Sequence, residues 1–178
     1  MHRLFVALRP PETIRDALID TMEGVEGARW QSDEQLHLTL RFVGEVDVAQ
    51  ANDLVSALEA VTAPPFTLQL RGLGTFVHKG RASALWAKVE ESEPLAILHR
   101  RVERACRAAG LAPETRKFVP HVTIARLNAS TGPIGGWLAT HGRLALPDWR
   151  VDGFELFESR LGRFGSDYAP VARFALRD

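Results

Sequence analysis

Cysteine and lysine are scarce in this chain. Cys106 is the single cysteine among 178 residues, and the three lysines are Lys79, Lys88 and Lys117. One cysteine excludes a disulfide framework and a cysteine-based metal site within the chain. Cys106 falls in a predicted helix, so we interpret it as a half-buried small residue rather than a catalytic thiol.

The chain also lacks an excess of charge of either sign. Its 22 basic residues balance its 22 acidic residues, and the isoelectric point is near 7. Proteins that bind long nucleic acids usually present a basic face, so binding to long nucleic acids is not expected. A small phosphate-bearing substrate, held by a few arginines, is not excluded.

A long apolar run is missing as well. Residues 1–8 lead directly into a predicted strand and do not have the pattern of a secretory or membrane-spanning segment. We therefore expect a cytoplasmic protein without a membrane partner. Because 46% of the residues are hydrophobic, the chain can bury a substantial core, and we expect a single domain over residues 1–178.

The hydrophobic pattern predicts a mixture of strands and helices. Apolar or alternating segments predict strands at residues 3–8, 29–30, 36–43, 66–70, 73–77, 84–89, 117–124, 149–157 and 171–176. Residues at helical spacing predict helices that begin near Pro11, Asp47, Pro94 and Ile134. The segment 66–89 is interpreted as a hairpin. Hairpins mixed with helices favour an α+β fold with antiparallel sheets over a doubly wound parallel sheet.

One pattern of residue types occurs twice. The sequence LHLTL at residues 36–40 has a counterpart, PHVTI, at residues 120–124. Side chains alternate faces along a strand, so each histidine shares a face with its threonine while the aliphatic residues share the other face. Two such strands in one small domain favour a functional role for both histidines over a purely structural one.

Metal binding and nucleophilic catalysis fit the two motifs poorly. Neither His37 nor His121 has a second ligand at local His-x-His or His-x-x-x-His spacing, and no carboxylate lies two or four positions away on the same strand face. Thr39 and Thr123 point parallel to their histidines rather than at them. That geometry suits two groups that contact one ligand better than a nucleophile with its base.

Paired acid–base catalysis fits the two motifs best. Histidine titrates near neutral pH, so one residue of a pair can begin protonated and the other neutral. One histidine would protonate a leaving oxygen while the other takes a proton from water or a hydroxyl. The threonine hydroxyls can hold phosphate oxygens, so the four residues predict a metal-free site for transfer at a phosphodiester.

The two motifs resemble the HxTx motifs of the 2H phosphoesterase superfamily, in particular its bacterial and archaeal branch, the RNA 2′,3′-cyclic phosphodiesterases, also called 2′-5′ RNA ligases. The likeness covers nearly the full chain. It includes RLFVAL at residues 3–8, HLTLRFVGEV at 37–46, Leu85-Trp86, PHVTIAR at 120–126, and ESRL at 158–161 with Gly165 and Tyr168.

The resemblance implies a bilobal α+β fold in which two antiparallel sheets lie around a central cleft with pseudo-two-fold symmetry, and helices lie on the outside. It implies hydrolysis of a 2′,3′-cyclic phosphate at an RNA or nucleotide end to a 2′-phosphomonoester. Reversible, ATP-independent 2′-5′ joining of RNA ends is the family's other activity. The implied partner is RNA or a nucleotide with such an end; no metal or cofactor is expected, and we expect a monomer.

The resemblance also assigns roles to the motif residues. His37 would be the proton donor to the departing 3′-oxygen, and His121 would be the base that activates water. Thr39 and Thr123 would hold the phosphate. The residues themselves do not decide which histidine is the acid.

Two arginines are further candidates for substrate contacts. Arg126 ends the second motif, although strict alternation places it on the face opposite to the histidine. Arg41 has the same parity as His37 and Thr39 and is therefore expected to face the substrate. The same parity predicts that Phe42 is a core residue rather than a platform for stacking a base.

Two alternatives to the cyclic phosphodiesterase remain open. The same site could act on ADP-ribose cyclic phosphate or on a 2′-5′ oligonucleotide. The chain could also be a binding module for RNA ends that has lost turnover, although binding alone does not require two titratable groups.

Overall fold

The computed structural model describes residues 1–163 and 165–178, and antiparallel strand pairing organises most of them. The larger sheet has eight strands, seven of them in the order β10-β9-β1-β3-β7-β6-β5, with β2 paired to β7. A separate two-stranded sheet consists of β4 and β8. The strands are β1 (His2–Leu8), β2 (Arg29–Trp30), β3 (Leu38–Val46), β4 (Phe66–Leu68), β5 (Leu70–His78), β6 (Arg81–Val89), β7 (His121–Arg126), β8 (Trp149–Val151), β9 (Gly153–Gly162) and β10 (Gly165–Ala175).

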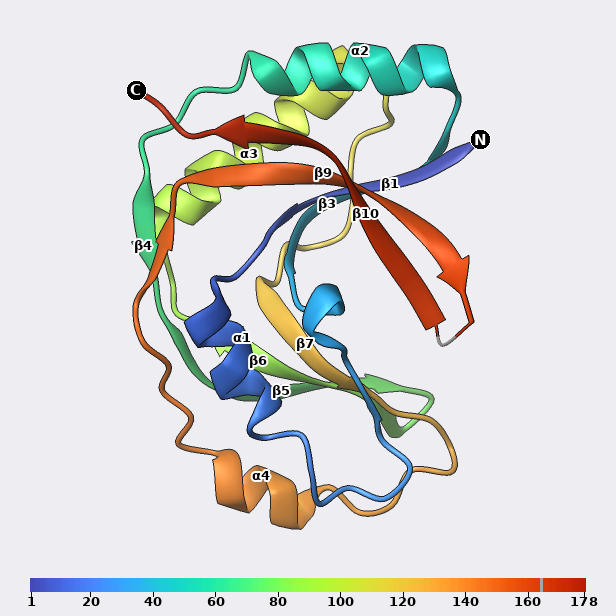
Figure 1. Ribbon diagram of the computed structural model, residues 1–178, viewed down its shortest axis with the longest axis vertical. Helices are drawn as coiled ribbons and strands as arrows, with labels where there is room; N and C mark the ends of the chain where they lie inside the picture. Colours follow the sequence, from blue (N-terminus) through green and yellow to red (C-terminus); the bar gives the residue numbers. More distant parts are fainter. Residues whose placement is uncertain (164) are drawn as a thin grey trace.

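The large sheet consists of two halves that diverge from each other. Strands β1, β3, β9 and β10 form one half, and β5, β6 and β7 form the other (Figure 1). In the described residues, Leu38 of β3 and Val122 of β7 are the register pair that joins the halves. The two sheets expected from the sequence are therefore joined at one pair, between the middle residues of the two motifs.

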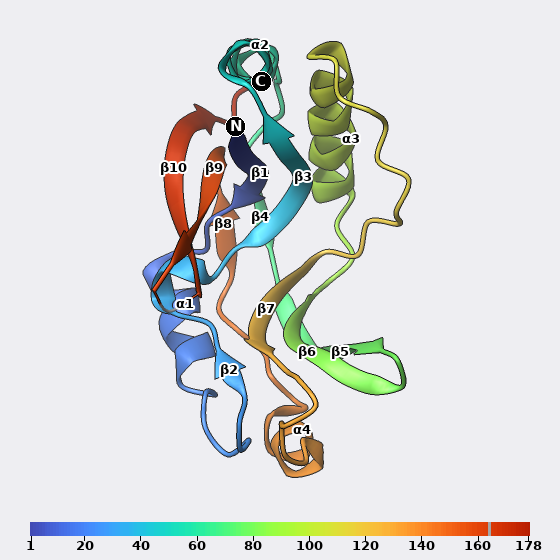
Figure 2. The ribbon, with the colours of Figure 1, turned by 90° about the vertical axis from the view of Figure 1, so that its right-hand side faces the viewer.

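Four α-helices and one 3₁₀ turn are found in the described residues: α1 (Glu12–Ile19), η1 (Asp33–Gln35), α2 (Val48–Glu59), α3 (Glu93–Ala108) and α4 (Gly135–His141). Helices α2 and α3 pack together on the half that contains β1 and β3, while α1 and α4 accompany the other half (Figures 1 and 2). None of these helices is both long and apolar enough to cross a membrane.

Side-chain caps fix the starts of the two longer helices. Asp47 accepts a hydrogen bond from the Gln50 backbone nitrogen at 2.8 Å, at the start of α2. Ser92 does the same for Leu95 at the start of α3, where Pro94 occupies the first turn. These caps satisfy N–H groups that have no partner within the helix, and they explain why the helices begin where the sequence predicts.

Alternation along β1 separates the packed core from the face that carries the site. One set of residues joins the main core with Leu54 of α2 and Leu98 of α3; it consists of Leu4, Val6 and Leu8. The other set, Phe5 and Ala7, packs with Phe157 in a small cluster on the opposite face of the sheet. That second face is the one toward which the histidine and threonine side chains point.

The α+β class and the antiparallel pairing are confirmed, and one predicted pairing is wrong. The hairpin predicted for residues 66–89 comprises only β5 and β6, that is, residues 70–89. Strand β4 pairs instead with β8, with Phe66 opposite Val151. The alternating pattern of residues 66–68 predicts a strand but does not identify its partner, which lies more than 80 residues away in the sequence.

Candidate active site

The two motifs meet in the middle of the large sheet. Because Leu38 pairs with Val122 in antiparallel register, His37 lies across from Thr123, and Thr39 lies across from His121. The histidines and threonines thus lie on one face of two adjacent strands, with each histidine diagonal to the other. The sequence predicted that each pair shares a face, and the strand pairing brings the two pairs together.

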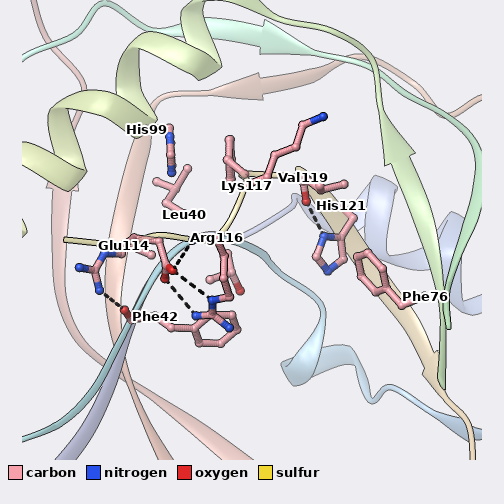
Figure 3. A pocket seen from close by; sticks show the side chains of 12 residues that line it. Leu40, Phe42, Phe76, His99, Glu114, Arg116, Lys117, Val119 and His121 are labelled. Carbon is pink, nitrogen blue, oxygen red and sulfur yellow. Dashed lines mark hydrogen bonds and ion pairs between the residues drawn. The ribbon is translucent and has the colours of Figure 1, made fainter. Parts of the chain in front are cut away.

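A cavity of about 520 Å³ lies over these four side chains. Besides the motif residues, Arg126 lines it from β7, and Arg3 and Phe5 line it from β1. The tip of the β9–β10 hairpin contributes Ser159, Leu161, Ser166 and Tyr168. A smaller hollow of about 190 Å³ adjoins it on the His121 side and shares Thr39, Phe42, Arg116 and His121 with it (Figure 3).

Both histidines are oriented in the same way by the backbone. His37 Nδ1 lies 2.6 Å from the carbonyl oxygen of Gln35, and His121 Nδ1 lies 2.7 Å from that of Val119. A carbonyl oxygen can only accept, so Nδ1 carries the proton in each ring. Each neutral imidazole therefore has an unprotonated Nε2 available to take a proton from a ligand or, once protonated, to donate one.

Burial keeps both histidines predominantly neutral near pH 7. The pKa of His37 is lowered to about 4, mainly by desolvation and in part by the charges of Arg126 and His121, while the hydrogen bond to Gln35 opposes this change. The pKa of His121 is also lowered, mainly by burial and in part by Arg126. Arg126 lowers the pKa of both histidines, so the three side chains lie in one electrostatic environment.

Aromatic rings hold both imidazoles in place. The ring centre of His37 lies 4.9 Å from that of Phe5 and 5.2 Å from that of Tyr168, which meets it edge-on. His121 meets Phe76 edge-on at 4.8 Å. Such contacts restrict the rotation of the rings and exclude water from one side of each, which is the physical origin of the desolvation.

Similarity to known proteins agrees with this geometry. A family model described as the 2′-5′ RNA ligase superfamily matches residues 10–163. The chain belongs to this superfamily. A protein of Aeropyrum pernix named RNA 2′,3′-cyclic phosphodiesterase is 32% identical over 161 residues, which cover 87% of this chain and 88% of that protein. A longer relative of the same name from Geobacillus stearothermophilus is 40% identical over 99 residues, and the match spans 54% of this chain and only 32% of that protein.

Solved structures of the superfamily share the fold over the whole chain. The structure of TT0787 of Thermus thermophilus has a TM-score of 0.81 and 29% identity, and the match covers 98% of both chains. Escherichia coli LigT complexed with 3′-AMP has a TM-score of 0.80 and 27% identity, with 99% of both chains covered. The family and the enzyme class predicted from the resemblance are confirmed.

Two β-bulges in this superfamily member change which side chains reach the cavity. In the pairing of β1 with β3, Leu40 has no partner, and Thr39 and Arg41 pair with consecutive residues of β1. In the pairing of β6 with β7, Ile124 is skipped in the same way. An extra residue reverses the alternation beyond it, so the third residue after each threonine, rather than the second, lies on the site face.

The bulge in β7 explains how Arg126 reaches the cavity. Strict alternation would place it on the core face, but the extra residue at Ile124 returns it to the face of Thr123, and Arg126 lines the cavity with the histidines. Arg126 is exposed, and no salt bridge or hydrogen bond of its side chain is found in the described part of the chain. Its charge is therefore available for an anionic ligand.

The bulge in β3 has the opposite effect on Arg41. Its side chain is only 8% exposed and forms an ion pair with Glu103 of α3, with Nε 2.6 Å from the carboxylate oxygen. The guanidinium thus points to the helices, and Arg41 is not among the residues that line the central cavity. Arg41 lines the smaller hollow with Thr39 but does not line the central cavity with His37. Strict alternation from Thr39 places Arg41 on the face of His37 because it does not allow for the residue inserted at Leu40.

The same bulge places Phe42 in the site. Phe42 is 53% exposed and lines both hollows, and its ring is stacked under the Arg116 guanidinium at 5.8 Å. The prediction that Phe42 is a core residue is wrong because strict alternation does not allow for the residue inserted at Leu40. Arg116 and Tyr168 are further cavity residues to which sequence reasoning assigned no role, since they come from a loop and from a hairpin distant in the sequence.

The donor groups of the site do not favour a metal. Residues 1–163 and 165–178 contain no group of three or more His, Cys, Asp or Glu side chains placed to hold an ion. His37 and His121 each use one ring nitrogen for a backbone carbonyl, and the charged residues that line the cavity with them are Arg3, Arg116 and Arg126, which repel cations.

Proposed function

We propose that this protein hydrolyses 2′,3′-cyclic phosphate ends of RNA or nucleotides to 2′-phosphomonoesters. The observation that carries the proposal is the pair of matching histidines, each with Nδ1 bonded to a carbonyl and Nε2 available, on opposite corners of one cavity. Relatives that are similar over most of the chain are named for this activity.

The placement of the histidines fits an in-line displacement. The attacking and leaving oxygens lie on opposite sides of the phosphorus, so an acid and a base on opposite sides of the phosphate can serve both. In the role assignment that the resemblance implies, His121 takes a proton from water as the new P–O bond forms. His37 gives its proton to the 3′-oxygen as that P–O bond breaks, and the phosphate stays on the 2′-oxygen.

The remaining site residues stabilise the phosphate. The hydroxyls of Thr39 and Thr123 can donate hydrogen bonds to its non-bridging oxygens, and the Arg126 guanidinium can neutralise their charge. Phe42, with Arg116 above it, offers an exposed ring on which a base can stack. The site thus contacts both the phosphate and the nucleoside of the substrate.

The substrate itself supplies the conditions for His37 to act as an acid. In the unliganded protein the pKa of His37 is about 4, so at pH 7 the ring is neutral, with a proton on Nδ1 and none on Nε2. A bound phosphodiester anion beside the ring favours the imidazolium and raises this pKa. Binding therefore favours a second proton on His37, at Nε2, which is the proton that the leaving oxygen needs.

Product analysis tests this function and its alternatives. An oligoribonucleotide with a 2′,3′-cyclic phosphate end should yield a 2′-phosphomonoester, whereas a 3′-phosphomonoester would contradict the proposed roles. ADP-ribose cyclic phosphate and a 2′-5′ oligonucleotide are assayed in parallel, and a clear preference for either would replace the proposal. Binding without any turnover would support the RNA-end binding module. Formation of 2′-5′ joined RNA from the same ends would add the ligase activity.

The state and location predicted from the sequence, a cytoplasmic monomer, stay predictions. Size-exclusion chromatography of the purified protein tests the first, and fractionation of cells tests the second.

A further inference from the structure

Arg41 occupies the back of the strand that carries the site. Its neighbours Thr39 and Phe42 line the cavity, whereas Arg41 points to α3 and donates hydrogen bonds to Glu103, to the carbonyl of Phe42 and to that of Ala112. The side chain therefore uses its whole guanidinium to connect β3 with α3 and with the segment that follows α3. It is almost completely buried, so these contacts are shielded from water.

Glu103 extends this connection. Its carboxylate accepts from Arg41, from Arg107 Nε at 3.1 Å and from the backbone nitrogen of Glu114 at 2.9 Å. Burial would raise the pKa of Glu103, but these donors outweigh it and hold the pKa below its usual value, so the group is charged. Residues 112–114 are thus held at both ends: Arg41 binds the carbonyl of Ala112, and Glu103 binds the backbone N–H of Glu114.

The segment thus held, residues 109–120, ends at the catalytic strand β7 and carries Arg116. Residues 111–120 contain no helix or strand, so side-chain contacts determine their path. Glu114 accepts hydrogen bonds from the Arg116 backbone nitrogen and from its guanidinium, each at 3.0 Å. The hydrogen bonds between Glu114 and Arg116 are dashed in Figure 3. Arg116, fixed in this way, lies over the ring of Phe42.

We propose that Arg41 and Glu103 are positioning residues for substrate binding: from behind β3 they hold residues 112–114, and through Glu114 they place Arg116 over Phe42. Without them, residues 112–114 lose these hydrogen bonds; Phe118 still stacks on His99 of α3, but it follows Arg116 in the sequence, on the side away from Glu114. Arg116 is then free to leave Phe42. The affinity for a nucleotide then falls, while the two histidines retain their own contacts. This inference rests on the proposed function, because it assumes that a nucleoside is bound beside Phe42.

Glu103→Gln tests the inference, because the amide keeps the size of the side chain but loses its charge. KM for a 2′,3′-cyclic nucleotide and Kd for the nucleoside 2′-monophosphate should each rise roughly tenfold, the loss expected for one cation–ring contact together with its ordering. The turnover number should stay within about threefold of that of the parent protein. Glu93→Gln is the matched control: this exposed glutamate of α3 forms an ion pair with Arg100 at 3.9 Å, and its replacement should change neither constant.

A double variant separates positioning from a general loss of stability. Arg116→Ala should raise KM as Glu103→Gln does, and Glu103→Gln/Arg116→Ala should bind no more weakly than Arg116→Ala alone, because both changes remove the same contact. Multiplied effects in the double variant, or an unchanged KM in Glu103→Gln, would overturn the inference. Arg41→Lys retains the charge but cannot reach three acceptors; it provides a second measurement, with KM again expected to rise.

Failure of the inference and failure of the proposed function give different results. Titration calorimetry with the nucleoside 2′-monophosphate measures binding without turnover. If the parent protein binds this product but does not hydrolyse the cyclic nucleotide, the proposed function fails while the effect of Glu103→Gln on Kd still tests the positioning. If the parent protein is active and Kd in Glu103→Gln is unchanged, only the positioning inference fails.

Discussion

Leu38 and Val122 pair where β3 meets β7, and this pair lies at the centre of a local two-fold relationship. On both sides of it a histidine bonds through Nδ1 to the carbonyl two residues before it, and a bulge follows the threonine. The equivalent residues after the bulges are Phe42 and Arg126. The two halves of the site are therefore alike in their histidines and threonines and differ in the residue after the bulge, which is an aromatic ring on one side and a positive charge on the other.

The low pKa of His37 predicts a loss of stability in acid. Between about pH 4 and pH 6.5 the unfolded chain protonates this histidine and the folded protein does not, so the free energy of unfolding falls as the pH decreases through this range. The loss attributable to His37 is at most about 3 kcal/mol. Urea unfolding at pH 7 and pH 5 measures the part of this loss that falls above pH 5.

His37→Gln isolates this contribution from that of the carboxylates. The variant should lose less stability than the parent protein between pH 7 and pH 5, because glutamine has no proton to bind. An equal loss in both proteins would mean that His37 titrates normally. The NMR titration of the His37 ring, expected near pH 4, gives an independent value.

Arg126→Ala should impair catalysis and alter both histidines. Removal of a charged contact to the phosphate is expected to reduce kcat/KM by about tenfold or more. The pKa of each histidine should rise, because Arg126 adds to the effect of burial in lowering both. Arg150→Ala, on the separate two-stranded sheet, is the control. Unchanged kcat/KM in Arg126→Ala would place this residue outside the site.

Three residues that follow the threonines, Arg41, Phe42 and Arg126, mark the limit of what the sequence predicts about this site. Alternation correctly places the histidines and threonines on one face, because no irregularity lies within either motif. It fails for Arg41, Phe42 and Arg126, because the bulges at Leu40 and Ile124 arise from how β1 and β6 pair with the motif strands. Leucine and isoleucine give no local sign of a bulge, so the inserted residue is visible only when both partner strands are known.

In the fold, too, the features that depend on neighbouring residues are predicted, and those that depend on distant segments are not. Caps and periodicity predict the starts of α2 and α3, since these depend on neighbouring residues. The pairing of β4 with β8 and the union of two sheets at Leu38 and Val122 depend on segments about 80 residues apart. Arg116 enters the site for a reason of the same kind, since buried contacts to Arg41 and Glu103 determine the path of its loop.

Gly74→Ala should disturb the His121 side of the site. Gly74 pairs with Trp86, and a Cβ at this position would overlap the indole ring, which itself lies 5.6 Å from the ring of His121. Because the ring must move, we expect a loss of about 1–3 kcal/mol in stability together with reduced turnover. Thermal unfolding and steady-state kinetics measure the two effects.

The matched control is Gly136→Ala in α4, where an added Cβ meets nothing within 4 Å. Its stability should be unchanged or slightly increased, because alanine favours a helix more than glycine does. If Gly74→Ala behaved like this control, the close packing of Trp86 beside His121 would be contradicted.

Activity should persist in excess EDTA. The proposed roles need protons and hydrogen bonds from His37, His121 and the two threonines, and Arg126 supplies the positive charge that a metal would otherwise provide. Initial rates with and without EDTA, after dialysis against the chelator, test this expectation. Abolition of the activity, with recovery on addition of a divalent ion, would revive a metal-dependent mechanism.

The most direct test of catalysis by the histidine pair is the turnover of His37→Ala, of His121→Ala and of the double variant on an RNA with a 2′,3′-cyclic phosphate end. Each single variant should lower kcat by about 10²-fold or more, as loss of a general acid or base does, and the double variant should be little worse than either. Each variant should bind the nucleoside 2′-monophosphate, showing that the cavity is intact. Near-full turnover in either single variant would contradict the two-histidine mechanism.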